Sequence, residues 1–182
     1  SSRRKPLILK GARQVGKTWL MQELGKNEYK NCVYINFDRE SWAKNLFEQD
    51  YDINRILLQL QAQSNQRIIA GETLIIFDEL QEAPRGLSVL KYFYEEAPEH
   101  HIVVAGSLLG ITLHQGESFP VGKVDVMQVK PLTFIEFLYA MGEDIKAMCI
   151  EEKRWDILKA LAPQYEELLR QYYFVGGMPE AV

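Results

Sequence analysis

The sequence predicts an α/β fold in which helices cover a parallel sheet, and two observations support this prediction. Short apolar runs alternate along the chain with segments whose apolar residues recur at helical spacing, which is typical of parallel strands joined by crossover helices. The chain has 182 residues, of which 47% are hydrophobic and 25% charged, the ordinary balance of a globular protein with a sizeable core.

Five apolar runs are expected to form the strands of this sheet. The third run, TLIIFDEL, is the most apolar and is therefore expected at the centre of the sheet. The fifth run, VDVMQV, alternates between apolar and polar residues and is expected at one side. In chain order the five runs are residues 6–10, 32–38, 73–80, 101–107 and 124–129.

The segments between and after these runs are expected to be helices. Gly25 is a plausible stop for the first helix, which starts at Lys17. Apolar residues recur at helical spacing over 53–63. Pro84 marks the start of a further helix, and a Thr133–Glu136 capping box starts another that ends at Gly142. A helix is also expected around 150–161, and Pro163 marks the start of the last one. The clearest loop is 108–123.

The segment GARQVGKT fits the pattern G-x-x-x-x-G-K-[ST] and lies between the first strand and the first helix. In this pattern backbone N–H groups surround phosphate oxygens, the lysine reaches the β- and γ-phosphates, and the hydroxyl holds Mg²⁺. A turn that merely needs glycine is the alternative, but a chance match in one chain is on the order of one in a hundred or rarer. The predicted nucleotide-binding residues are Gly11, Ala12, Arg13, Gln14, Val15, Gly16, Lys17, Thr18 and Trp19.

Asp78 and Glu79 follow four apolar residues at the end of the third strand. Ligands of open parallel sheets bind at the carboxyl ends of the strands, so Asp78 is expected to bind Mg²⁺ together with Thr18. The adjacent Glu79 is expected to act as general base toward a water molecule. Solvated carboxylates at a strand end are the alternative, which the spacing from Lys17 makes less attractive.

Ser107 ends the fourth strand, where it could sense the γ-phosphate or serve as a helix N-cap. Lys17, Glu79 and Ser107 are thus the predicted catalytic residues. GTP is disfavoured as the nucleotide, because no N-K-x-D motif is present and no glycine follows two residues after Asp78.

The order of GARQVGKT, YINFD, LIIFDELQEAP, AGSLLG, PLTFIEFL and GGMPEAV resembles the prokaryotic ATPases of the AAA superfamily that carry a C-terminal domain of unknown function. DELQEAP, AGSLLG and GGMPEAV are the narrower motifs, and the resemblance extends over essentially the whole chain. It implies a P-loop NTPase fold with strand order 5-1-4-3-2, and ATP with Mg²⁺ as ligands. Residues 1–142 would be the ATP-binding domain, and the helical segment 143–182 would lead to a C-terminal domain absent from this chain.

The sequence departs from this family at Lys123, which stands where members commonly carry an arginine. An arginine aimed at the γ-phosphate is worth about 10³–10⁵ in rate, and a lysine cannot clamp a phosphate bidentately. Lys123 would then substitute weakly, or the arginine would come from a neighbouring subunit, from the absent domain, or from Arg85 or Arg154. We therefore expect slow ATP hydrolysis by this chain alone.

Two other functions remain open on the sequence alone. DELQ also fits the D-E-x-Q pattern of nucleic-acid helicases, but the second lobe and the basic channel that helicases need are not visible. The chain could also be a nucleotide-gated interaction module that does not hydrolyse ATP. The net charge of -4 gives no electrostatic case for nucleic-acid binding by this segment, so such binding is expected only through the absent domain.

Composition also bears on location and partners. No apolar run approaches the ~20 residues of a membrane span, and no signal peptide is visible. Cys32 and Cys149 are far apart and without metal-like spacing, so both are expected to be reduced. We therefore expect a cytoplasmic protein without membrane contact, whose partners are ATP, the attached domain and, as in other AAA modules, further copies of itself.

Overall fold

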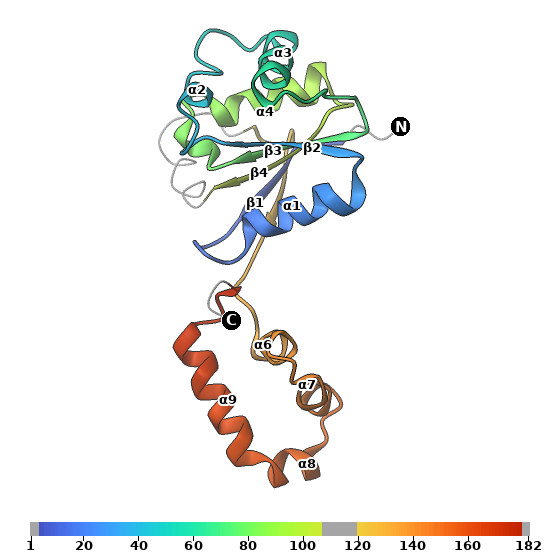
Figure 1. Ribbon diagram of the computed structural model, residues 1–182, viewed down its shortest axis with the longest axis vertical. Helices are drawn as coiled ribbons and strands as arrows, with labels where there is room; N and C mark the ends of the chain where they lie inside the picture. Colours follow the sequence, from blue (N-terminus) through green and yellow to red (C-terminus); the bar gives the residue numbers. More distant parts are fainter. Residues whose placement is uncertain (1–3, 107–119, 180–182) are drawn as a thin grey trace. The chain divides into compact units, whose positions relative to one another are not determined.

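A computed structural model of the chain describes residues 4–106 and 120–179, shown in Figure 1. These residues form two compact units, the first within 1–11 and 17–128 and the second within 12–16 and 129–182. Within the described ranges, no helix combines the length and the apolar character that a membrane span requires.

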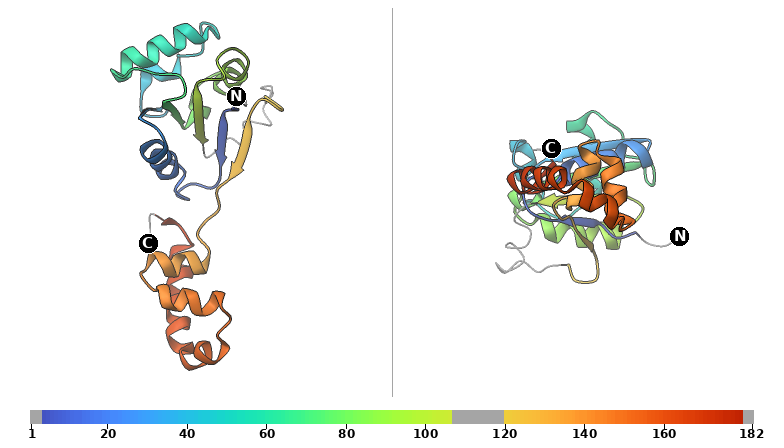
Figure 2. Two further views of the ribbon diagram at one scale, coloured as in Figure 1. Left: turned by 90° about the vertical axis from the view of Figure 1, so that its right-hand side faces the viewer. Right: turned by 90° about the horizontal axis from the view of Figure 1, so that it is seen from below.

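The first unit is built on a five-stranded sheet in which every pairing is parallel. The arrows of β4, β1 and β5 point the same way in the left view of Figure 2. The order β2-β3-β4-β1-β5 confirms the predicted one. The strands are β1 (Leu7–Lys10), β2 (Asn31–Asn36), β3 (Thr73–Asp78), β4 (His101–Gly106) and β5 (Asp125–Gln128).

The middle position of the sheet belongs to β4, so the expectation that run 73–80 is central was wrong by one place. All six residues of β3 are buried, as are five of the six in β4. Both strands have a neighbouring strand on each side, so apolar content cannot show which of the two is at the centre of the sheet. The fifth strand lies at the edge as expected, and its four residues are exposed.

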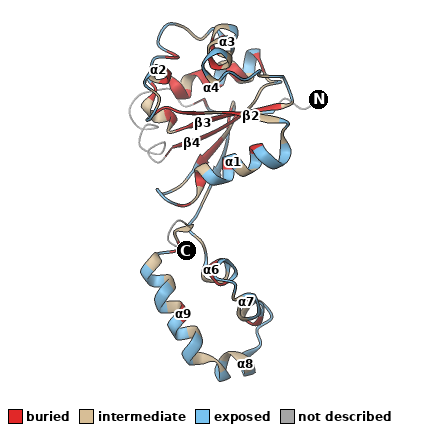
Figure 3. Cartoon of the chain, viewed as in Figure 1, coloured by how far each residue is buried: buried red, intermediate tan, exposed pale blue. Residues whose placement is uncertain are grey.

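Helices cover both faces of the sheet, with α1 (Lys17–Glu28) on one face and three helices on the other (Figure 1). Those three are α2 (Ser41–Lys44), α3 (Ile53–Ser64) and α4 (Gly86–Glu96). Alternate residues of β3 divide between the faces, because Ile75 and Phe77 join the core with α3 and α4, whereas Ile76 faces α1. Figure 3 shows the buried residues concentrated in the strands.

Gly25 does not end the first helix, as the sequence suggested, but lies inside α1. A Cβ at this position would lie 3.0 Å from the Cβ of Cys32 in β2. The glycine therefore allows the helix backbone to approach the sheet closely. A glycine that serves close packing and a glycine that ends a helix look the same in a local sequence window.

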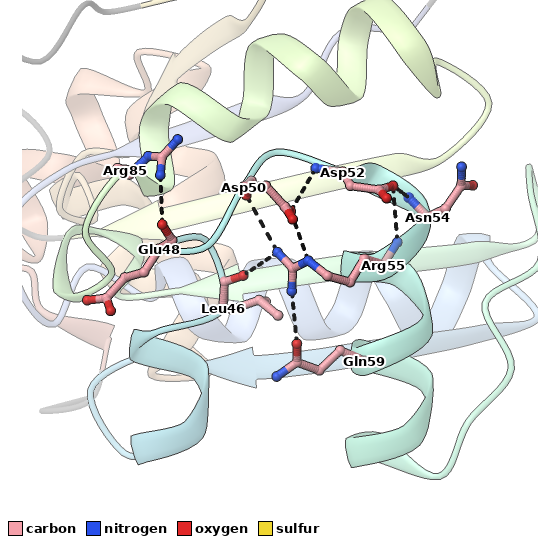
Figure 4. Close-up of polar contacts among 8 residues, drawn as sticks. All are labelled: Leu46, Glu48, Asp50, Asp52, Asn54, Arg55, Gln59 and Arg85. Atoms are coloured by element: carbon pink, nitrogen blue, oxygen red, sulfur yellow. Dashed lines mark hydrogen bonds and ion pairs between the residues drawn. The ribbon is translucent and has the colours of Figure 1, made fainter.

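The loop before α3 is held by Arg55, whose guanidinium binds three neighbours (Figure 4). Its Nε lies 2.8 Å from an Asp50 carboxylate oxygen, and its other two nitrogens donate to the Leu46 carbonyl at 3.0 Å and to Gln59 Oε1 at 3.1 Å. Asp52 caps the same helix by accepting from the backbone N–H groups of residues 54 and 55.

Replacing Arg55 with methionine is expected to lower the free energy of unfolding by about 1.5–3 kcal/mol, because hydrogen bonds to a charged group are lost and their acceptors are left partly buried. Urea unfolding followed by tryptophan fluorescence measures the change. Arg67→Met is the matched control, since the exposed Arg67 should contribute no more than about 0.5 kcal/mol. Equal effects of the two substitutions would contradict the prediction.

Four helices make up most of the second unit: α6 (Phe134–Ala140), α7 (Asp144–Glu151), α8 (Trp155–Ala160) and α9 (Ala162–Val175). The capping box at Thr133 and Glu136 is present as predicted. The single helix expected over 150–161 is replaced by α7 and α8, with Lys153 between them at a left-handed φ of 54°. The core of this unit consists of Phe137, Leu138, Ala147 and Leu168.

Two consecutive glycines follow α9, and both have left-handed φ angles, 67° at Gly176 and 66° at Gly177. A Cβ at Gly176 would meet nothing within 4 Å, whereas a Cβ at Gly177 would lie 2.5 Å from the carbonyl oxygen of Leu132. The backbone N–H of Leu132 also donates to the Gly177 carbonyl at 2.8 Å. The two positions thus differ in close packing but not in φ.

Gly177→Ala is therefore expected to destabilise this segment by roughly 1–3 kcal/mol more than Gly176→Ala, whose cost is about 1–2 kcal/mol of backbone strain. Hydrogen exchange of the Leu132 amide, followed by NMR, reports on the contact directly. Protection should fall in Gly177→Ala and persist in Gly176→Ala. Similar protection in both variants would show that the close approach does not matter.

Candidate functional site

The segment that fits the phosphate-binding pattern links the end of β1 to the start of α1. Gln14 and Gly16 within it have φ angles of 63° and 84°. A left-handed conformation is unfavourable for a residue with a side chain, so the strain lies at Gln14 and not at Gly16. Backbone strain of this kind concentrates at functional sites.

Lys17 lies at the first position of α1 and is only 7% exposed. Its Nζ donates to the carbonyl oxygen of Gly11 at 3.1 Å. Burial lowers the pKa of the Lys17 ammonium, and the charges of Glu79 and Asp78 act in the opposite direction. A buried cation beside two acids is a fitting place for a polyanion accompanied by a divalent metal ion.

Asp78 ends β3 and is 3% exposed, and the structure brings it against Thr18 of α1. The Thr18 hydroxyl donates to Asp78 Oδ2 at 2.8 Å, and the backbone N–H of Glu79 donates to Oδ1 at 3.1 Å. The two residues predicted to hold Mg²⁺ are therefore adjacent although 60 positions separate them in the sequence.

Glu79 follows β3 with a left-handed backbone, at φ 53° and ψ 42°. Its side chain accepts a hydrogen bond from Gln81 Nε2, in the 3₁₀ turn η1 (Leu80–Glu82). The same Gln81 has a buried Oε1 that finds no hydrogen-bond partner among the described residues. The predicted base is thus only partly buried and is held by a neighbour two residues away.

Tyr34 and Asn36 of β2 extend this cluster, and the sequence analysis did not identify Tyr34. The Tyr34 hydroxyl donates to Asp78 Oδ2 at 2.8 Å, and Asn36 Nδ2 donates to the Tyr34 oxygen at 3.3 Å. Burial, more than any other cause, raises the pKa of the Tyr34 hydroxyl to about 12. The signal available in the sequence was the polar end of an apolar strand next to β3.

The oxygen donors in this cluster fit magnesium. Thr18 offers a hydroxyl and Asp78 a carboxylate, and Mg²⁺ is usually bound by one or two protein oxygens together with substrate phosphates and water. A cage of protein ligands is not required, and the described residues contain no group of three or more His, Cys, Asp or Glu side chains suited to a metal ion.

The remaining predicted residues are distributed as follows. Ser107 lies outside the described residues, as does most of the expected loop 108–123. Trp19 is 63% exposed on α1. Lys123 Nζ lies 3.1 Å from a carboxylate oxygen of Glu95. The Arg85 guanidinium donates to the Tyr51 hydroxyl and to the Glu48 carbonyl, each at 2.8 Å, so structural contacts hold both of these cations.

An all-parallel sheet of this order, with a glycine-rich loop after its first strand and an acidic pair after its third, defines the P-loop NTPase fold. The particular family follows from comparison: a family model described as an AAA domain matches residues 3–138. The chain therefore belongs to this AAA family and contains a P-loop ATPase module. No curated protein matches the chain.

Solved structures share the fold, among them the following two. The Walker-type ATPase PABY2304 of Pyrococcus abyssi superposes with a TM-score of 0.56 at 17% identity, covering 96% of this chain and 60% of that one. A structure of Drosophila ORC bound to DNA gives a TM-score of 0.56 at 16% identity, covering 99% and 55%. The chain thus spans somewhat more than half the length of each.

Proposed function

We propose that the chain binds ATP with Mg²⁺ and hydrolyses it, and that this cycle switches or drives an attached C-terminal domain. The observation that supports this most strongly is the 2.8 Å hydrogen bond between Thr18 and Asp78. It joins the hydroxyl of the glycine-rich segment to the acid of the third strand, where a phosphate-bound metal ion needs oxygen donors from both.

Each residue of the cluster has a role in this proposal. Lys17 and the N–H groups of the loop bind the β- and γ-phosphates, and Thr18 and Asp78 would hold Mg²⁺, which neutralises charge on the phosphates when bound. Glu79 accepts a proton from water as the water oxygen attacks the γ-phosphorus. The bond from that phosphorus to the bridging oxygen breaks, and ADP and inorganic phosphate leave. Ser107 senses the γ-phosphate.

The predicted division of the chain, with an ATP-binding domain over 1–142 and a helical segment over 143–182, is part of the proposal. The proposal also includes a cytoplasmic location, a prokaryotic source and assembly with further copies of the chain. It further includes nucleic-acid binding, but only through an attached domain. The net charge of -4 supports the last point, since the chain as a whole has no net positive charge to attract a phosphate backbone.

The test is phosphate release by the 182-residue chain with Mg·ATP, with and without DNA, together with its mass in solution. A typical enzyme turns over about 10 times per second. An arginine at the γ-phosphate raises the rate about 10³–10⁵-fold, so without one the expected rate is on the order of 10⁻² per second or slower, and DNA should not change it.

Turnover at tens per second would contradict the slow-hydrolysis proposal, and stimulation by DNA would favour the helicase-like alternative. Tight binding without any phosphate release would favour the non-hydrolysing module.

A further inference from the structure

Tyr34 lies outside the glycine-rich segment and outside the acidic pair, yet its hydroxyl contacts the centre of the site. In the parallel pairing of β2 with β3, Tyr34 is opposite Ile76 and Asn36 is opposite Asp78. Tyr34 is therefore the diagonal neighbour of Asp78 on one face of the sheet, a distance that an aromatic side chain can bridge. Its hydroxyl donates to Asp78 Oδ2 at 2.8 Å.

The direction of this hydrogen bond follows from the chemistry of the three groups. A phenol has one proton to donate, and an ionised carboxylate can only accept. The amide of Asn36 donates to the Tyr34 oxygen at 3.3 Å, so the phenol accepts from Asn36 and directs its own proton to Asp78. Asn36 is in turn fixed, because its Oδ1 accepts from the backbone N–H groups of residues 38 and 39.

Two hydroxyls thus converge on one carboxylate oxygen. Thr18 and Tyr34 each donate to Asp78 Oδ2 at 2.8 Å, while the Glu79 N–H donates to Oδ1. A buried carboxylate with donors on both oxygens has little freedom to rotate. Of the two hydroxyls, Thr18 is itself a proposed metal ligand, whereas Tyr34 comes from the neighbouring strand β2.

We propose that Tyr34 is a positioning residue that holds the Asp78 carboxylate in the orientation needed for Mg²⁺, and thereby strengthens the magnesium-dependent part of nucleotide binding. This inference rests on the proposed function. Partners that orient a metal-ligating group typically contribute 10–100-fold to metal affinity. Tyr34→Phe keeps the ring and removes the hydroxyl, so it isolates this contribution.

The experiment measures affinity for ATP by calorimetry in excess Mg²⁺ and again in EDTA, and then titrates Mg²⁺ at fixed ATP. For Tyr34→Phe we expect an unchanged affinity in EDTA and a Mg²⁺ midpoint raised about 10–100-fold. Tyr29→Phe is the matched control. It also removes a half-buried tyrosine hydroxyl, one that lies 3.0 Å from His101 Nδ1 at the opposite ends of the strands, and it should behave as wild type.

The outcomes separate this inference from the proposed function. If wild type binds ATP more tightly with Mg²⁺ and Tyr34→Phe shows the same Mg²⁺ midpoint, the positioning role is wrong and the proposed function stands. If Tyr34→Phe weakens binding equally in Mg²⁺ and in EDTA, the hydroxyl has a general structural role and the inference is again overturned. If wild type binds no nucleotide in either condition, both fail.

Discussion

Lys17→Ala should reduce the affinity of the chain for Mg·ATP by more than about 100-fold, because each hydrogen bond from a charged donor to a phosphate is worth about 1.5–3 kcal/mol and the lysine reaches two phosphates. The side chain of Lys17 is buried at the start of α1, and its Nζ donates to the Gly11 carbonyl. Calorimetry with Mg·ATP measures the loss directly.

Lys26→Ala is the control for this substitution. Lys26 lies in the last turn of the same helix, where its side chain is 75% exposed and pairs only loosely with Glu23 at 3.7 Å. Its loss removes the same charge from α1 without touching the loop, so affinity should stay within about twofold of wild type, as an exposed pair is worth little. An equal loss of Mg·ATP affinity in both variants would contradict the prediction, because it would show that Lys17 acts only through its charge at long range.

Glu79→Gln should leave ATP binding intact and lower the turnover rate by about 10²–10⁴-fold, the usual contribution of a general base. Glutamine keeps the shape of the side chain and cannot take a proton from water. The main-chain contact of residue 79 with Asp78 Oδ1 is also kept, since the donor there is the backbone N–H. Single-turnover phosphate release and ATP affinity are measured on the same preparation.

Glu82→Gln provides the matched comparison, three residues further on in the same turn. It also removes one negative charge near the end of β3, but no water-activating role is assigned to it, and turnover should be within about threefold of wild type. Wild-type hydrolysis by Glu79→Gln would show that another group is the base.

The strands of the sheet could be predicted well from the sequence, because a strand that is buried on both faces is recognisable as a continuous apolar run. TLIIFD contains four consecutive apolar residues, and all six residues of β3 are buried. Strand order leaves no such pattern, and it was supplied by the family resemblance. Apolar content alone placed β3 at the centre in error, because β3 and β4 each have a neighbouring strand on both sides and both are largely buried.

Local patterns failed where a tertiary contact decides the outcome. Gly25 resembles a helix stop but is needed for the close approach to Cys32. The break between α7 and α8 depends on Lys153 adopting a left-handed φ, which the composition of that segment does not signal. The four-residue α2 is too short for any periodicity to appear.

The candidate site divides in the same way. Residues within a contiguous pattern, such as Lys17 and Thr18, were identified together with the acidic pair at the end of the third strand. Tyr34 was not, because its contact with Asp78 joins residues 44 positions apart and depends on the register between β2 and β3. Gln81 was noted only as part of DELQ, and its hydrogen bond to Glu79 depends on the turn that η1 makes.

The central claim is that a triphosphate and its magnesium ion bind where Lys17, Thr18 and Asp78 meet. Calorimetric titration of the 182-residue chain with ATP, in Mg²⁺ and then in EDTA, tests it most directly. The account predicts saturable binding at one site per chain that weakens when Mg²⁺ is removed. The absence of any binding heat with Mg·ATP, at concentrations where AAA modules are saturated, would contradict it.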